Sequence, residues 1–456
     1  MLKRIPSSYV LLFYIIFILG IASYFIQAGT YEREVDINTG ISYVVSNSYT
    51  VIEKTPVSFF EFFKAIPQGL MESSDIIMFV LIIGGSFGVI QATGTIDAFF
   101  GSLVRMYEGK EKILVIIIMT VFSLAGGILG TAEEALPFYP LVISVAIALG
   151  YDKMTGVAIL LLGTGSGFAA GFLNPFTTGI AQNISELPMF SGMTLRIFAH
   201  IIFLTTAIVY LFRYTNKIEK EIENDINENN FHINLKMLAG LSNQQKRVAV
   251  TVIIVFVFLI VGILKYKFHI LEIATTFFIM SILGGLVGGL KPGRISSEFV
   301  KGASNLIYGA LIIGVANGVG VIMRYGNIMD PIIHKLAGSI EGFNPTVSLI
   351  GILVVNIIIS LFISSGSGQA AATMPIMKTV ADLSGVTRQA GVLAYQFGDG
   401  LTNIISPTSG YVIAALALAD IEWRDWVKWF LPLYIIWLIE GVIILLLANA
   451  FNYGPF

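Results

Sequence analysis

Two adjacent carboxylates, Glu133 and Glu134, follow a turn of small residues at 126–132 and lie between two long apolar stretches. A carboxylate at membrane depth costs several kcal/mol unless it is paired, protonated or placed in a water-filled cavity. In such a place it can bind the ammonium or guanidinium group of a substrate, or carry a proton. The alternative is that one of the two carboxylates only caps or packs a helix.

Two prolines interrupt apolar stretches, at Asn174-Pro175 and at Ser406-Pro407. A helix broken inside the membrane leaves N–H and C=O groups without partners, and such breaks persist where they line a cavity or coordinate something. A freed helix N-terminus favours a carboxylate, while carbonyls and hydroxyls suit a small cation or the polar atoms of a substrate. A kinked helix packed on its neighbours is the alternative, and two breaks at equivalent positions argue against it.

A second small polar turn, at residues 364–369, resembles the first. Asp399 and Asn403 lie one helical turn apart, just before the second break, where contact with a substrate or a cation is expected. The candidate substrate-binding residues are therefore Glu133, Glu134, Asn174, Pro175, Thr177, Thr178, Ser365, Ser367, Gln369, Asp399, Asn403, Ser406, Thr408 and Ser409.

The elements that must position these residues are apolar helices. The chain has 456 residues, of which 55% are hydrophobic and 12% are charged. Apolar runs of about 20 residues, each long enough to cross a bilayer, recur along it, whereas a soluble domain carries about a quarter charged residues. We predict an all-α polytopic membrane protein, multi-pass in the lipid bilayer.

Composition argues against several other classes of protein. The chain has no cysteine and four scattered histidines, which leaves no disulfide, iron–sulfur centre, thiol nucleophile or paired metal-ligand motif. The net charge of -2 provides no basic field for nucleic acid. We expect no enzyme activity and no cofactor, with Na⁺ or H⁺ as a possible coupling ion and a small molecule as the substrate.

The two halves of the chain look alike. We predict a first repeat at residues 1–213, a cytoplasmic linker at 214–247 and a second repeat with one extra span at 248–456. The matches keep one order: Glu61-Phe62 with Glu298-Phe299, Gly88-Val89-Ile90 with Gly320-Val321-Ile322, Gly130…Pro137 with Gly368…Pro375, Gly156-Val157 with Gly391-Val392, and Asn174-Pro175 with Ser406-Pro407. A single match would carry little weight, but a series in one order indicates an internal repeat.

Each repeat is expected to contain a re-entrant hairpin and a broken helix. The hairpins are predicted at residues 113–149 and 346–381, and the broken helices at 155–187 and 387–418. With the N-terminus in the cytoplasm, most of the 27 basic residues fall on the cytoplasmic side, as the positive-inside rule requires. This gives about nine full spans. An odd number of crossings separates equivalent elements, so the repeats are expected to be inverted.

Four other polar residues are predicted to have structural roles. Asp75 and Arg324 lie near the ends of predicted spans, where long or charged side chains reach toward the interface. His200 and Glu440 lie within spans but away from either break, so we expect hydrogen bonds between helices for them.

Longer motifs around the first hairpin and the first break are similar to those of a known family. They are Ala132-Glu133-Glu134-x-x-Pro137-Phe138-Tyr139-Pro140 and Phe172-Leu173-Asn174-Pro175-Phe176. From Ile5 to the last span the sequence resembles the YfcC family, which belongs with the DcuC-type carriers of the ion-transporter superfamily. The resemblance implies a secondary carrier of the bacterial inner membrane, a homodimer with one site in each protomer, and elevator-type motion.

The family resemblance leaves the substrate open, because members are called arginine/ornithine antiporters, basic amino acid antiporters or four-carbon dicarboxylate carriers. The predicted site contains Glu133, Glu134 and Asp399 and has no Lys or Arg at a turn or break. An amino acid could place its carboxylate on the helix N-termini and its amine on the acidic groups. We therefore expect an amino acid antiporter of the arginine/ornithine type. The alternative is a sodium- or proton-coupled carrier of four-carbon dicarboxylates or other organic anions, with the acidic groups as the coupling-ion site.

Overall fold

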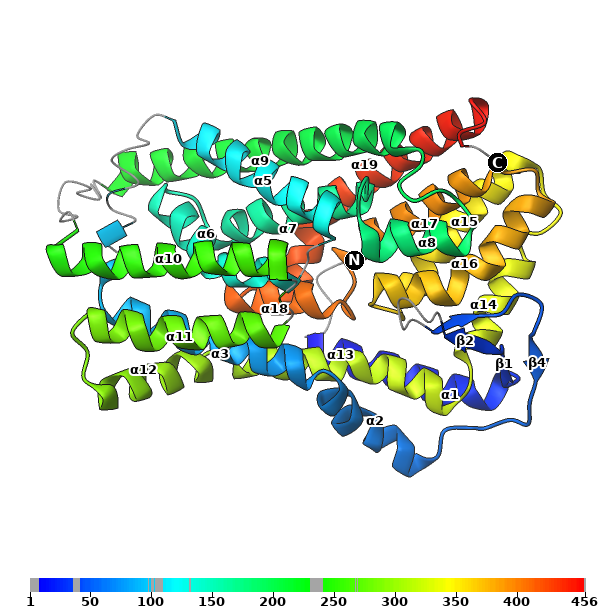
Figure 1. Cartoon of the computed structure of the whole chain (residues 1–456), viewed down its shortest axis with the longest axis horizontal. Helices are drawn as coiled ribbons and strands as arrows, with labels where there is room; N and C mark the ends of the chain where they lie inside the picture. Colours follow the sequence, from blue (N-terminus) through cyan, green and yellow to red (C-terminus); the bar gives the residue numbers. More distant parts are fainter. Residues whose placement is uncertain are drawn as a thin grey trace.

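The computed structural model describes residues 8–35, 42–96, 98–99, 102, 110–130, 133–229, 241–266, 268 and 270–454 (Figure 1). Nearly all of its regular structure is helical, as the apolar runs predict. The helices of the first half are α1 (Ser8–Phe25), α2 (Phe59–Glu72), α3 (Ser74–Ala92), α5 (Glu111–Leu129), α6 (Tyr139–Ala148), α7 (Lys153–Ala170), α8 (Ile180–Ile184) and α9 (Met193–Asn229). Two short helical segments, η2 (Glu133–Phe138) and η3 (Pro175–Gly179), directly precede α6 and α8.

The second half is also helical. Its helices are α10 (Asn243–Tyr266), α11 (Ile270–Val287), α12 (Pro292–Ser304), α13 (Ile307–Tyr325), α14 (Met329–Gly338), α15 (Pro345–Ser360), α16 (Gly366–Leu383), α17 (Arg388–Asn403), α18 (Gly410–Leu418) and α19 (Trp423–Ala450). The chain is interrupted before α16 and before α18, as it is before η2 and before η3 in the first half. The expected linker at 214–247 is partly helical, because α9 continues to Asn229 and α10 begins at Asn243.

Six described helical segments are long and apolar enough to cross a membrane, or seven if the pair α13 and α14, bent by 80° at their junction, counts as one span. The multi-pass membrane character is therefore supported, while the number of nine spans stays a prediction. In the segment Lys153–Ile184, which contains α7, 89% of the apolar window is buried inside the protein, against 28 to 44% in the other five. The segment that contains Asn174 and Pro175 is therefore enclosed by the rest of the molecule.

Helices of the two halves pack against each other. Helix α2 packs against α13, and α12, which carries the Glu298-Phe299 pair that matches Glu61-Phe62 of α2, packs against α3. Glycines allow both close approaches: a Cβ at Gly69 would lie 2.4 Å from the carbonyl oxygen of Gly314, and a Cβ at Gly302 would lie 2.3 Å from that of Gly84. Small residues at helix crossings permit such backbone contact. This exchange brings the junction between α2 and α3 next to α13.

A short strand region lies at one end of the molecule, beside α14 (Figure 1). Strand β1 (Gly29–Thr30) pairs antiparallel with β4 (Thr50–Val51), and β2 (Arg33–Val35) pairs antiparallel with β3 (Ser42–Val44). The guanidinium of Arg33 contacts Asp330 at 2.7 Å, and the hydroxyl of Tyr31 lies 2.8 Å from Nδ1 of His334. These contacts fix the region on α14.

Candidate functional site

A polar cavity of about 620 Å³ lies where the interruptions of the two halves meet. Its wall includes the junction of α2 and α3, the start of η3, the turn before α16, the end of α17, the start of α18 and part of α13. Six of the predicted site residues line it: Thr177, Ser365, Ser367, Asn403, Thr408 and Ser409.

Asn174 and Pro175 build the first break and do not line the cavity. The side-chain oxygen of Asn174 accepts hydrogen bonds from the backbone N–H groups of Phe176 (2.9 Å) and Thr177 (3.1 Å). Asparagine is a preferred cap at such a position, and Pro175 follows it as the first residue of η3. These N–H groups are therefore already satisfied by the protein, so the first break is less available to a substrate carboxylate than the sequence suggested.

Thr178 joins the two broken helices. Its hydroxyl contacts the carbonyl oxygen of Gly171 at 2.7 Å and Oε1 of Gln396, on α17, at 2.9 Å. Gln396 in turn donates to the carbonyl of Phe168 at 2.6 Å. The carbonyl groups freed where α7 ends are thus bound by side chains, and Thr178 contributes to the shape of the site from outside the cavity.

The second break leaves a helix N-terminus open to the cavity. Ser406 and Thr408 bond to each other at 2.7 Å, and Thr408 also donates to the carbonyl of Leu361 at 3.0 Å. Ser409 precedes α18 but makes no side-chain capping bond, and its buried hydroxyl has no partner among the described residues. Because Gly410 and Tyr411 line the cavity, the first N–H groups of α18 can bind an anionic group there.

The turn before α16 forms another part of the wall. Ser365 caps α16 by accepting from the N–H of Gly368 at 3.3 Å, and its hydroxyl lies 3.1 Å from that of Ser367. Gln369 lies away from the cavity, where its amide donates to the carbonyl and side-chain oxygens of Asn356 at 3.0 and 3.1 Å. Gln369 therefore fastens α16 to α15, while the two serines face the cavity.

Asp399 is fully buried directly behind this turn. One carboxylate oxygen accepts from the side-chain amide of Asn403 at 2.9 Å. The other carboxylate oxygen, the side-chain oxygen of Asn403 and the hydroxyl of Thr177 are buried without a partner among the described residues. A Cβ at Gly366 would lie 2.7 Å from the free oxygen of Asp399 and 2.6 Å from Thr177, so the three elements converge. Buried polar atoms without partners are costly, and these oxygens suit a cation or a substrate ammonium group.

Sequence reasoning did not anticipate the wall formed by α2, α3 and α13. Glu72 and Asp75 line the cavity, together with Asn317. Arg324 bonds to the carboxylate of Glu72 and neutralises it, while Asn317 donates to the same oxygen at 3.4 Å. The structure records no ion pair of Asp75 with another described residue. The expectation that Asp75 and Arg324 only lie near span ends is therefore incomplete: Asp75 also lines the cavity, and Arg324 pairs with a residue that lines it. Nothing in the local sequence indicates that α13 packs on α2.

The side chains of Glu133 and Glu134 lie outside the described part of the structure. Gly130, which ends α5 shortly before them, does line the cavity. In the described residues no group of three or more His, Asp or Glu side chains could hold a metal ion.

Comparisons with known proteins match most of the chain. The family model described as C4-dicarboxylate anaerobic carrier (DcuC) matches residues 5–450. The Escherichia coli protein named "Putative basic amino acid antiporter YfcC" is 33% identical over 77% of this chain and 73% of its own length. A Haemophilus influenzae protein named only as uncharacterized is 30% identical over 88% of this chain and 80% of its own length.

Two solved structures also align with the chain at low identity. Neisseria gonorrhoeae MtrF, described with a class of antimetabolite efflux pumps, is 19% identical, with 97% of this chain and 95% of the other covered and a TM-score of 0.42. The YdaH transporter of Alcanivorax borkumensis is 16% identical, with 99% and 100% covered and a TM-score of 0.43.

Proposed function

The chain belongs to the DcuC family of C4-dicarboxylate anaerobic carriers, and from this premise we propose that it is a secondary transporter that exchanges amino acids of the arginine/ornithine type. Membership of a transporter family and the apolar helices make it a multi-pass membrane protein that moves a small molecule. The relative from E. coli carries a name with the same substrate class, basic amino acids.

One observation carries the choice of substrate. The polar cavity combines an open helix N-terminus at α18 with acidic side chains, and no Lys or Arg is among the described residues that line it. Asp75 lies on the wall, and the free oxygen of buried Asp399 lies close behind the turn at Gly366. These carboxylates would repel a dicarboxylate dianion, and only hydroxyls and backbone N–H groups would attract it.

In the proposed binding mode, the carboxylate of the amino acid lies at the N-terminus of α18, near Ser409 and Thr408. The α-ammonium group faces the oxygens of Thr177, Asn403 and Asp399. The cationic end of the side chain faces Asp75, since Glu72 is already paired with Arg324. Each charged group of the substrate then meets a group of opposite charge, and the pairing is strongest at the fully buried Asp399, where less water screens it.

The second candidate is a sodium- or proton-coupled carrier of four-carbon dicarboxylates. The description of the family favours it, and so does Arg324, whose guanidinium could bind a substrate carboxylate if it left Glu72. In this case the unpartnered oxygens of Asp399, Asn403 and Thr177 would hold the coupling ion, since Na⁺ prefers oxygen ligands of this kind.

The same proposal includes the arrangement in the membrane. We place two inverted repeats at residues 1–213 and 248–456, with the linker at 214–247 and the N-terminus in the cytoplasm of a bacterial inner membrane. The proposal also includes about nine membrane spans, a homodimer and elevator-type motion. The reciprocal packing of α2 on α13 and of α12 on α3 supports the two-fold relationship of the repeats.

Glu133 and Glu134 keep their proposed role as groups that bind the amine or carry a proton, since they follow shortly after Gly130, which lines the cavity. Asn174, Pro175, Thr178, Gln369 and Ser406 enter the proposal as residues that hold the breaks and the hairpin in place, because their described bonds are to the protein itself.

Ligand-dependent thermal stabilisation of the purified protein tests the substrate class. A ligand that binds only the folded state raises the melting temperature, and the stabilisation grows with the logarithm of its concentration above Kd. We expect stabilisation by arginine and ornithine and none by succinate, fumarate or malate, with or without sodium. Stabilisation by the dicarboxylates alone would replace the first candidate by the second.

A further inference from the structure

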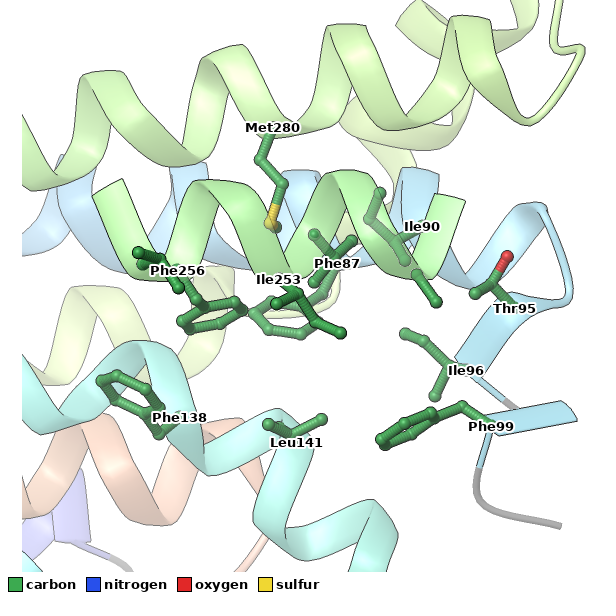
Figure 2. Close-up of a pocket in the computed structure, with 13 residues that line it drawn as sticks. Phe87, Ile90, Thr95, Ile96, Phe99, Phe138, Leu141, Ile253, Phe256 and Met280 are labelled. Atoms are coloured by element: carbon green, nitrogen blue, oxygen red, sulfur yellow. The ribbon is translucent and has the colours of Figure 1, made fainter. Parts of the chain in front are cut away.

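An apolar pocket of about 290 Å³ lies between α3, α6, α10 and α11 (Figure 2). It shares no lining residue with the polar cavity. Among the described residues that line it, Thr95 is the one polar side chain, and its hydroxyl lies 2.7 Å from that of Thr93. The pocket therefore offers hydrocarbon surface and no free polar group.

The two long walls of the pocket come from different parts of the fold. Figure 2 shows Phe138 and Leu141 facing Phe256 and Ile253 of α10 across the pocket. At one end the rings of Phe138 and Phe256 are 5.1 Å apart. At the other end the side chain of Gln245 donates to the carbonyl of Gly94 at 3.0 Å, which places the first turn of α10 next to Thr95.

The chemistry of the lining selects a hydrocarbon ligand. An apolar cavity of about 150 Å³ stays dry and accepts benzene, and this pocket has about twice that volume. Water would find no hydrogen-bond partner in it. The adjacent face of α10 is exposed, with Val250 at 54% and Ile254 at 61%, so in a membrane the acyl chains of the bilayer lie beside the opening.

Two basic residues lie on α10 just before the positions that line the pocket. The pocket-lining positions of α10 form a helical stripe that begins at Ala249, and Lys246 lies one turn earlier on the same stripe. Lys246 and its neighbour Arg247 are both exposed. Basic side chains at the mouth of a pocket between membrane helices bind anionic lipid headgroups.

We propose that this pocket is a binding site for an anionic phospholipid, with one acyl chain between α10 and α6 and the headgroup phosphate at Lys246. Phe138 and Leu141 follow directly after the segment that contains Glu133 and Glu134. The bound chain therefore contacts the first hairpin on one side and α3, α10 and α11 on the other. The site stands apart from the proposed transport function, since it is defined by binding alone.

The test uses the full chain in nanodiscs that contain equal amounts of phosphatidylglycerol and phosphatidylcholine, followed by delipidation in detergent and native mass spectrometry. The variant Ile253→Trp fills the pocket, and Ile254→Trp adds the same ring to the adjacent exposed position as the matched control. We expect the wild type and Ile254→Trp to retain phosphatidylglycerol over phosphatidylcholine by about fivefold. Ile253→Trp should retain about fivefold less lipid, and Lys246→Gln should bring the two lipids to equal retention.

Equal retention by Ile253→Trp and the wild type would overturn the proposal, as would a wild type that keeps no lipid or shows no headgroup preference. A change of oligomeric state in Ile253→Trp without a change in lipid would mean that a second copy of the chain covers the pocket. If Ile253→Trp does not remain monodisperse, Ala249→Phe fills the same pocket with a smaller side chain and is judged by the same criteria.

Discussion

The side-chain amide of Asn403 donates to one carboxylate oxygen of Asp399 across 2.9 Å, and the second carboxylate oxygen has no partner among the described residues. The two residues lie one turn apart at the end of α17, where the helix stops before Ser406 and Pro407. Asn403 lines the polar cavity, while Asp399 is fully buried behind the turn before α16, at Gly366. A carboxylate in this place is held in a fixed orientation with one oxygen available to a ligand.

We expect Asp399→Asn to reduce transport at least about tenfold while the protein remains folded, because the amide keeps the shape but removes the charge that faces a cation. The measurement is the initial rate of arginine uptake into proteoliposomes, with size-exclusion chromatography as the check on folding. Asp420→Asn is the matched control, since Asp420 is an exposed loop residue after α18. Equal uptake by the two variants would mean that Asp399 is not part of the binding site.

The turn before α16 should tolerate no side chain at Gly366. A Cβ there would lie 2.7 Å from the free oxygen of Asp399 and 2.6 Å from Thr177, distances that force one of these groups to move. We expect Gly366→Ala to reduce uptake at least about tenfold, since a small displacement of positioned groups costs that much. Gly293→Ala, where a Cβ meets nothing within 4 Å, should transport normally. Normal uptake by Gly366→Ala would mean that the turn does not pack against Asp399 during transport.

Asp75 should distinguish a cationic substrate from a neutral one. If its carboxylate faces the guanidinium of arginine, Asp75→Asn raises the concentration of arginine needed to inhibit labelled uptake by about tenfold, the loss of about 1.4 kcal/mol. Citrulline, which has the same length and no charge, should be affected much less. Competition curves for both amino acids on the wild type and the variant give the two ratios. If Asp75→Asn raised the inhibitory concentrations of arginine and citrulline by the same factor, the cationic end of arginine would not lie at Asp75.

A surface cluster predicts how stability depends on pH. Lys378 and Arg388 donate to the carboxylate of Glu186 at 3.0 and 2.6 Å, and these hydrogen bonds hold the pKa of Glu186 below its usual value of 4.5. A lowered pKa stabilises the fold above the unfolded value, and this contribution disappears as the pH falls through the folded value. We expect Glu186→Gln to have a lower melting temperature than the wild type at neutral pH. This difference in melting temperature should disappear between about pH 5 and pH 3.

The control for this prediction is Glu53→Gln, a change at an exposed carboxylate of the strand region. This variant should have the same melting temperature as the wild type at every pH. A difference between Glu186→Gln and the wild type that persists at low pH would mean that the glutamate acts through its packing and not through its charge.

Local signals in the sequence predicted the interruptions of the helices. Proline cannot continue a helix, and the chain is interrupted at both prolines: Asn174 caps η3, which begins at Pro175, and Pro407 lies between the end of α17 and the start of α18. The intramembrane hydrogen bonds were also predicted: His200 lies 2.7 Å from the hydroxyl of Ser123, and Glu440 accepts from Thr206 at 2.6 Å. Isolated polar groups in apolar helices need such partners, which makes them predictable from one chain segment.

The assembly of the cavity wall could not be predicted in the same way. Glu72 and Asp75 reach the cavity because Gly69 lets α2 pack closely on α13, a contact between segments far apart in the sequence. The 80° bend between α13 and α14 is another feature that the sequence analysis did not predict. Likewise, a sequence pattern cannot tell whether a polar residue at a break faces the cavity, as Thr177 does, or bonds to the protein, as Thr178 does.

Counterflow in proteoliposomes tests the central claim most directly. Vesicles loaded with unlabelled ornithine and diluted into radiolabelled arginine should take up the label far faster than empty vesicles, without any ion gradient. Asp399→Asn vesicles should show no such stimulation. Absence of stimulation by internal ornithine, together with uptake of labelled succinate driven by a sodium or proton gradient, would contradict the account and establish the dicarboxylate carrier in its place.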